Sequence, residues 1–194
     1  MGAAPFQTFE ITLGQYWGAM WNSDRGDHYI SFQAPGDAAP FLPLGGLAYN
    51  GTSWPAPDML RPLLYMPSPD VPDSLAHPVD YTWILDDAGS GNEYDINYWW
   101  PVAPPNYVAM GVVFRPGDTP VLTDYWCVHE RYVVQTTAHE YWSDSGQGWR
   151  HHNGDLLIAD MPNPAPPNAV HPQTLLSAEA MGNGMGVPYV LSWS

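Results

Sequence analysis

Residues 78–115 read PVDYTWILDDAGSGNEYDINYWWPVAPPNYVAMGVVFR, and this stretch decides the fold. An aromatic run at 81–85 leads into an acidic, glycine-rich loop at 86–92, which is followed by a second aromatic run at 94–100. A proline-rich turn then precedes an apolar run at 107–114. Short aromatic and β-branched runs between turn residues are typical of β-strands, so the stretch predicts three strands joined by tight turns.

Similar runs occur along the rest of the chain. They predict further strands within residues 6–21, 28–32, 41–49, 59–66, 121–135, 156–159, 170–180 and 187–193. No long segment spaces its apolar residues at the i, i+3, i+4, i+7 positions of an amphipathic helix, so we expect little helix. Residues 173–181 are the best helical candidate.

The central pattern recurs on both sides. Trp21, Trp83 and Trp142 each precede an acidic glycine loop, and they are 62 and 59 residues apart. A proline-bearing turn and an apolar run follow each loop, which defines internal units at roughly 6–66, 78–135 and 139–194.

Units of this size cannot bury an apolar face alone, so they are expected to pack around a shared axis. The sequence therefore predicts a single all-β domain over residues 1–194, a three-fold pseudo-symmetric β-prism of about twelve short strands in three sheets. We expect the first and last strands to meet in one sheet. The alternative is an ordinary β-sandwich in which the repeat is accidental.

The central unit resembles the vacuolar protein sorting-associated protein 62 family of fungi, plants and some bacteria. The resemblance lies in the segments PVDYT at 78–82, DAGSG at 87–91, WPVAPP at 100–105, YVAMG at 107–111, PVL at 120–122 and CV at 127–128. Residues 156–159 depart from the family pattern, and the first unit has no double proline. The resemblance implies an all-β, prism-like domain. Prism domains of this shape often serve as lectins or as targeting modules of toxins, an analogy at the level of fold.

Composition and charge exclude several classes of partner. Five basic residues, all Arg, stand against 20 acidic ones, for a net charge of −15. Such a surface repels phosphate backbones and anionic membranes, which argues against nucleic-acid binding. It leaves carbohydrate or another small neutral ligand, cations and basic partners. No run of 18 apolar residues is present, so no membrane span is expected.

The N-terminal MGAAPFQTFEI has no basic region followed by a long apolar run, so no signal peptide is visible. Cys127 is the single cysteine, which excludes an intrachain disulfide and gives no sign of an oxidising compartment. We therefore expect synthesis in the cytoplasm, with non-classical release left open. The oligomeric state is left open as well.

The acidic loops and the tryptophans form the first candidate site. The predicted ligand-binding residues are Asp24, Asp86, Asp87, Gly89, Asp144, Trp100 and Trp149. Carboxylates accept hydrogen bonds from sugar hydroxyls, and indole rings stack on the apolar face of a pyranose; Trp83, Trp99 and Trp142 are further candidate platforms. Alternatively, Asp and Gly serve turn geometry alone. In a third interpretation, Asp86, Asp87 and Asp144 hold Ca²⁺ through hard oxygen ligands, although the EF-hand spacing is missing. No other cofactor is expected.

A second candidate group contains His139, Glu140, His151 and His152. Imidazoles in this number are able to ligate a transition metal or act as acid and base, but the spacing fits neither HExxH nor a Cys/His finger. Solvated or structurally satisfied histidines are the alternative.

The sequence favours a soluble, lectin-like carbohydrate-binding module that uses Asp/Gly loops and exposed aromatic residues. The first alternative is a small enzyme, a hydrolase or cyclase, with one His/Asp/Glu pocket. The second is a toxin-accessory or other interaction module, which is expected to expose an apolar patch away from the acidic loops.

Overall fold

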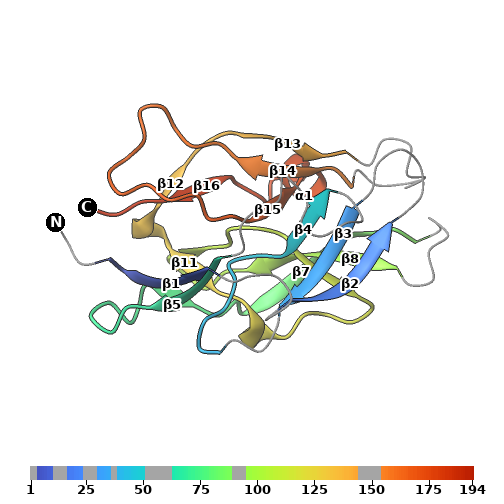
Figure 1. Cartoon of the computed structure of the whole chain (residues 1–194), viewed down its shortest axis with the longest axis horizontal. Coiled ribbons are helices and arrows are strands. Elements are labelled where there is room, and N and C mark those ends of the chain that lie inside the picture. The colour runs from blue at the N-terminus through green and yellow to red at the C-terminus, as the bar shows by residue number, and fades with distance from the viewer. Residues whose placement is uncertain are drawn as a thin grey trace.

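The chain is an all-β protein built from small antiparallel sheets (Figure 1). The computed structural model describes residues 4–10, 17–23, 30–35, 39–50, 63–88, 95–143 and 154–194. The strands are β1 (Phe6–Glu10), β2 (Trp17–Ser23), β3 (Ile30–Pro35), β4 (Leu47–Asn50), β5 (Leu63–Pro67), β6 (Leu75–Ala76), β7 (Asp80–Asp86), β8 (Ile96–Val102), β9 (Tyr107–Val108), β10 (Val113–Pro116), β11 (Cys127–His129), β12 (Val133–Gln135), β13 (Ala138–Trp142), β14 (Leu156–Ala159), β15 (Leu175–Ser177) and β16 (Tyr189–Leu191). Two 3-10 turns, η1 (Leu122–Asp124) and η2 (Glu130–Tyr132), and one short helix, α1 (Ala178–Gly182), complete the elements of the described residues.

The strands are shorter and more numerous than the sequence predicted. Among the described residues they number up to β16, against about twelve expected, and they form six sheets rather than three. The difference in strand number arises within individual segments of the chain. The run at 121–135 is broken by η1 and η2, and residues 67–78, which lie outside the runs predicted as strands, contain the short strand β6. The best helical candidate, 173–181, overlaps α1, which begins at Ala178 and ends one residue beyond that segment.

Three of the sheets share one plan. Their strand orders are β2-β3-β4, β7-β8-β10 and β13-β14-β15, and all neighbouring strands are antiparallel. In each sheet the first strand has a one-residue register shift against the second, as a β-bulge produces. The bulges lie between Ala19 and Trp21, between Trp83 and Leu85, and between Glu140 and Trp142.

The positions of the bulges show that the three tryptophans of the sequence repeat are not all structurally equivalent. Trp21 and Trp142 are the first paired residues after their bulges, but Leu85 holds that position in the middle sheet. Trp83 lies before its bulge, pairs with Trp99, and is 43% exposed, whereas Trp142 is 2% exposed. The tryptophan spacing therefore reflects a repeat of sheets, although Trp83 itself is not the structural counterpart of the other two.

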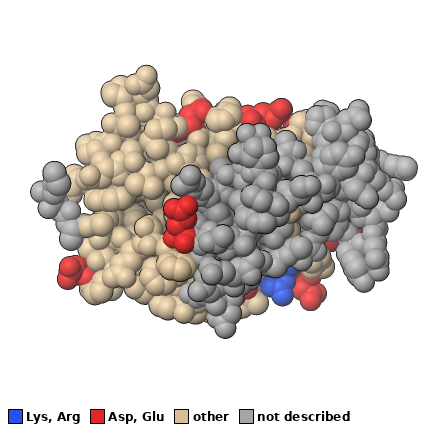
Figure 2. Space-filling model, viewed as in Figure 1, with Lys and Arg blue, Asp and Glu red and all other residues tan. Residues whose placement is uncertain are grey.

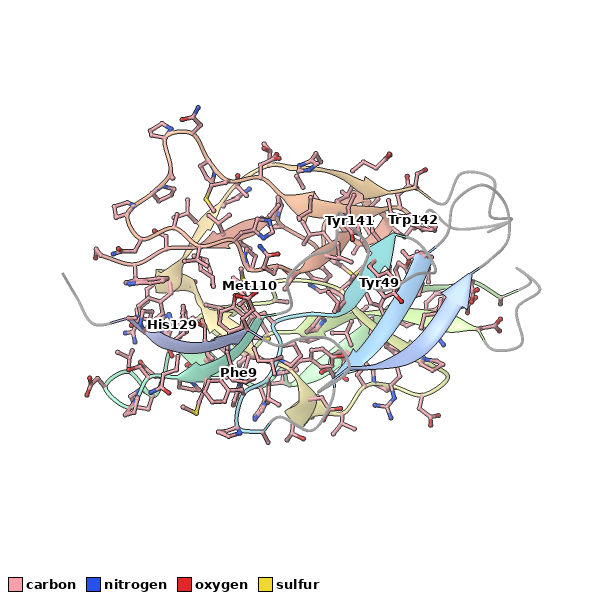
Figure 3. The ribbon with its side chains drawn as sticks, in the orientation of Figure 1. Phe9, Tyr49, Met110, His129, Tyr141 and Trp142 are labelled. Carbon is pink, nitrogen blue, oxygen red and sulfur yellow. The ribbon has the colours of Figure 1, made fainter. Side chains whose placement is uncertain are left out.

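One large hydrophobic core joins these three sheets. The second strand of each sheet contributes a fully buried residue, namely Phe32, Tyr98 and Leu156. The rings of Phe32 and Tyr98 meet edge to face with centroids 5.8 Å apart. The Tyr141 hydroxyl of β13 donates a 3.4 Å hydrogen bond to the carbonyl of Ala48 on β4, and Figure 3 labels Tyr141 and the following Trp142.

Three small residues bring the sheets together at one junction. A Cβ built on Gly45 would lie 3.2 Å from the Cα of Gly111 and 3.3 Å from the Cβ of Thr174. Two backbone hydrogen bonds cross the same place: Gly46 N–H donates to the Val112 carbonyl at 2.7 Å, and Val112 N–H donates to the Leu175 carbonyl at 2.9 Å. This close approach of backbones explains the glycines of the 41–49 and 107–114 runs.

The remaining sheets, β1-β5, β6-β11-β9 and β12-β16, surround a second core. Each contains the strand that precedes a bulged strand. Phe6, Tyr65 and Met110 belong to this second core, and Figure 3 labels Met110 in the interior.

The expectation that the first and last strands share a sheet is wrong. β1 pairs with β5, and β16 pairs with β12. The two ends instead meet through side chains, because the ring of Phe6 packs edge-on against Trp193 at 6.0 Å. Figure 1 shows β1 and the C-terminal residues at the same end of the molecule.

Candidate functional site

A groove of about 340 Å³ opens between the end of the middle three-stranded sheet and the segment that enters β16. The residues that line it are Thr82, Trp100, Pro101, Val102, Ala103, Tyr107, Val108, Ala109, Met185, Val187 and Tyr189. None of these residues carries a formal charge, and three are aromatic. The volume falls within the ordinary range for small-ligand sites.

Trp100 forms the rigid part of the groove. It lies on β8, directly opposite Thr82 of β7, and it is 7% exposed because most of its ring packs in the large core. The turn after α1 covers the ring, held by hydrogen bonds from the N–H groups of Met185 and Gly186 to the carbonyl of Ala180 at 2.9 and 3.2 Å.

Gly186 allows that turn to approach closely. An added Cβ would lie 3.3 Å from Cη2 of Trp100 and 3.1 Å from Cγ of Met181. The shape of the groove therefore depends on a position without a side chain.

The groove contains few polar groups, and one of them already makes a hydrogen bond within the protein. The Tyr107 hydroxyl donates to the Asp73 carbonyl at 2.8 Å. Burial, followed by the charge of Asp73, raises the pKa of Tyr107, so this phenol remains a donor at neutral pH. Within the described part of the chain, the hydroxyls of Thr82 and Tyr189 make no hydrogen bond, so both are open to a ligand.

Two of the predicted loop carboxylates stabilise their own turn. Asp86 Oδ1 accepts the N–H of Ala88 at 3.0 Å, and Asp87 Oδ1 accepts the N–H of Ile96 at 2.6 Å. Asp87 is 1% exposed. Contacts of this kind are those expected where Asp serves turn geometry, one of the interpretations that the sequence left open.

The other predicted site residues divide into two groups. Trp100 lies in the groove, as described above. Asp24, Gly89, Asp144 and Trp149 lie outside the described residues, as do His151 and His152.

His139 belongs to a separate polar cluster on the third sheet. Its Nδ1 lies 2.7 Å from Oδ1 of Asp160, whose second oxygen accepts a hydrogen bond from the hydroxyl of Thr137. These bonds, that of Thr137 first, lower the pKa of Asp160. The His139 side chain is 63% exposed, so the pair lies on open surface. Over the described ranges, no group of three or more His, Cys, Asp or Glu side chains is arranged to hold a metal ion.

An apolar area occurs on the outer side of the middle sheet. Val79, Tyr81 and Trp83 follow one another at every second position; Val79 and Trp83 are 56% and 43% exposed, whereas Tyr81 between them is buried. The Tyr81 hydroxyl donates to the carbonyl of Val121, which is itself 48% exposed. Successive side chains of a strand face opposite sides of its sheet, so Trp83 and Thr82 point away from one another. This area is the kind of feature expected of the interaction-module alternative.

Acidic side chains stand at several separate places on the face shown in Figure 2. In the part of the chain that the structure describes, no helix is long and apolar enough to cross a membrane.

Neither the protein-family models nor the curated proteins contain a match to this chain. Among solved structures, the fold is similar to the crystal structure of GNIP1Aa from Chromobacterium piscinae, with a TM-score of 0.70 and 19% sequence identity. The match covers 90% of this chain and 33% of that chain, so the present chain spans about a third of the length of its structural neighbour. At this identity the likeness shows a shared β-rich fold.

Proposed function

We propose that the chain is a carbohydrate-binding module whose ligand, an uncharged sugar, lies in the groove above Trp100. The observation that carries the proposal is the composition of the groove: aromatic and aliphatic walls, two uncommitted hydroxyls and no charged side chain. A pyranose has an apolar face and a rim of hydroxyls, and such a groove complements both. On this view the carbohydrate site lies at the end of the middle sheet, and Asp86 and Asp87 serve to hold their own turn.

We also propose that the three bulged sheets are the faces of a three-fold β-prism, each supported by one of the smaller sheets. The shared strand order, the three bulges and the junction at Gly45, Gly111 and Thr174 support this arrangement. Membership of the vacuolar protein sorting-associated protein 62 family is part of the same proposal, and it rests on the sequence segments of the central unit.

A panel of methyl glycosides of glucose, galactose and mannose tests the sugar proposal, with binding followed by saturation-transfer NMR. Thr82→Val and Tyr189→Phe each remove one hydroxyl and keep the shape of the groove. A neutral hydrogen bond contributes about 0.5 to 1.5 kcal/mol, so each change should weaken binding by about 2- to 12-fold.

The control is Trp83→Leu, which removes an exposed indole from the opposite face of the same sheet. It should leave affinity unchanged. If no glycoside binds, or if Trp83→Leu abolishes binding while Thr82→Val and Tyr189→Phe have no effect, the groove is not the sugar site.

Charge provides a second discriminating measurement. The chain carries a net charge of −15, and the groove offers no cation to a carboxylate. A uronic acid should therefore bind more weakly than the matching neutral hexose. Added salt should reduce this difference in affinity, because it screens the repulsion between the two negative charges.

A further inference from the structure

The segment between β14 and β15 contains a histidine, His171, whose two ring nitrogens both make hydrogen bonds to the backbone. Nε2 lies 2.9 Å from the carbonyl oxygen of Ala159, the last residue of β14. The N–H of Gln173 donates to Nδ1 at 2.9 Å. A carbonyl oxygen only accepts, so Nε2 carries a hydrogen, and Nδ1 must carry none in order to accept from Gln173. The two bonds together require the neutral ring in this one tautomer.

The bond to Nδ1 holds a backbone conformation that is unfavourable on its own. Gln173 has a φ of 58°, in the left-handed region that residues other than glycine adopt rarely. The next two residues belong to the junction of the three bulged sheets. Thr174 Oγ1 donates to the Met110 carbonyl at 2.7 Å, and the Leu175 carbonyl accepts from the N–H of Val112 at 2.9 Å. The histidine ring therefore holds the segment at the point where it enters the junction.

Protonation of the ring would oppose this bond. An imidazolium carries a hydrogen on both nitrogens, so Nδ1 would then point a donor at the N–H of Gln173. Burial, the largest cause, lowers the pKa of His171, and the charge of a protonated His139 acts in the same direction. The hydrogen bond to the Ala159 carbonyl and the carboxylate of Asp160 act against this lowering of the pKa. The closed segment therefore favours the neutral ring.

The elements around the segment bring no other charged group to it. β14, β15 and β16 consist of residues without acidic or basic side chains. β5 contributes Tyr65, whose hydroxyl donates to the carbonyl of Pro172 at 3.3 Å and stays neutral because burial raises the pKa of the phenol. Among the described residues, His139 of β13 and Asp160 after β14 are the charged groups that act on the ring.

We infer that His171 is a pH-sensitive latch on the junction of the three bulged sheets. At neutral pH the ring holds Gln173 in place, and in acid the ring takes up a proton and releases it. The sign follows from linkage. The released imidazole has the ordinary pKa of 6.5, above the pKa of the closed ring, so the closed segment loses stability as the pH falls through 6.5. The latch is separate from the groove and does not depend on sugar binding.

Amide hydrogen exchange of the full chain between pH 7.5 and 5.5, corrected for the intrinsic exchange rate, measures the opening of the segment. Each pH unit below 6.5 favours the protonated, open segment about tenfold, so the protection of the Gln173 and Val112 N–H groups should fall by about tenfold over this range. The N–H of Val79, which donates to the Val102 carbonyl at 2.9 Å, should keep its protection and reports on any general loss of stability.

Two variants assign the effect to one ring. His171→Asn offers an amide oxygen in place of Nδ1 and does not titrate, so the protection of Gln173 should no longer depend on pH. His139→Gln removes the neighbouring imidazole and should retain the tenfold fall. In the wild-type chain, NMR of the ring nitrogens should show the Nε2–H tautomer of His171 at pH 7.5.

Three results would overturn the latch, whether or not a sugar binds. They are an Nδ1–H or charged His171 ring at pH 7.5, a wild-type Gln173 whose protection does not change with pH, and an equal fall of protection in His171→Asn. The first two need no variant, so they decide the question even if His171→Asn does not fold.

Discussion

The junction of the three bulged sheets gives a sharp prediction for Gly111→Ala. A Cβ at this position would lie 2.7 Å from the carbonyl oxygen of Leu175 and 2.9 Å from the Cβ of Thr174. Both atoms belong to the backbone or are attached directly to it, so a rotamer change cannot relieve the clash. The two chain segments must separate, and the neighbouring hydrogen bond from Val112 N–H to the Leu175 carbonyl must lengthen.

The expected cost follows from these contacts. Overpacking a close-packed core costs about 1 to 3 kcal/mol, and weakening one buried hydrogen bond costs about 1 kcal/mol. Replacing Gly by Ala also stabilises the folded state by about 0.4 to 1 kcal/mol, because the substitution reduces the conformational entropy of the unfolded chain. We therefore expect the free energy of unfolding to fall by about 2 to 3 kcal/mol, and the melting temperature to fall by about 5 to 10 °C.

Urea denaturation followed by tryptophan fluorescence measures this change. The matched control is Gly182→Ala, because an added Cβ at this position meets nothing within 4 Å. Gly182 lies in α1, and alanine has the highest helix propensity of any residue. Gly45→Ala should fall between the two, since its nearest contact is 3.2 Å from the Cα of Gly111. Equal stabilities of Gly111→Ala and Gly182→Ala would refute the close junction.

Three further predictions follow from individual side chains. Gly186→Ala should weaken sugar binding and shift tryptophan emission, because the new methyl group presses on Trp100; unchanged emission and affinity would argue against this contact. The pKa of Asp160 is lower in the folded chain than its ordinary 3.8, so its carboxylate stabilises the fold at neutral pH and that contribution is lost as the pH falls below 3.8. Thr137→Val should raise this pKa in a carboxyl NMR titration, and an unchanged value would contradict the assigned bond. Burial raises the pKa of Cys127 to about 12, so a thiol reagent should label it only in urea, and rapid labelling of the native chain would be inconsistent with this packing.

Local pattern was sufficient to predict much of the fold. β14 occupies the predicted run at 156–159, and β7 and β8 lie within two residues of the predicted runs. These segments carry aromatic or β-branched residues between turn residues, and both their strand character and their limits are therefore local properties.

Local sequence pattern did not predict the bulges or the junction. A bulge inserts one residue into a strand without any requirement for a particular side chain, so the sequence alone did not show that Leu85 matches Trp21 and Trp142. The run at 41–49 was predicted as a strand, and the pattern gives no reason for the paired glycines at 45 and 46. A Cβ on Gly45 would crowd Gly111 and the side chain of Thr174, and a Cβ on Gly46 would clash with the ring of Phe114, so both glycines answer to residues that no local window contains.

The candidate site was predicted only in part. Trp100 was named as a binding residue and lines the groove. Thr82, Tyr107 and Tyr189 were missed, because the groove is assembled from segments that are distant in the sequence. Tyr189 stands beside a glycine-rich turn, and that proximity was the one signal available before the fold was known.

The junction also has a consequence for how the chain is made. Gly45 and Gly111 are 66 residues apart, and Thr174 follows 63 residues later, so the contact joins three segments that are distant in the sequence. A ribosome releases these segments in order, and the two earlier ones have no third partner until residues 174 and 175 emerge. Sheets that depend on such distant partners fold slowly, and their apolar faces stay accessible meanwhile. We therefore expect nascent chains that stop before residue 174 to remain sensitive to protease and to require a chaperone, and the domain to acquire resistance in one late step.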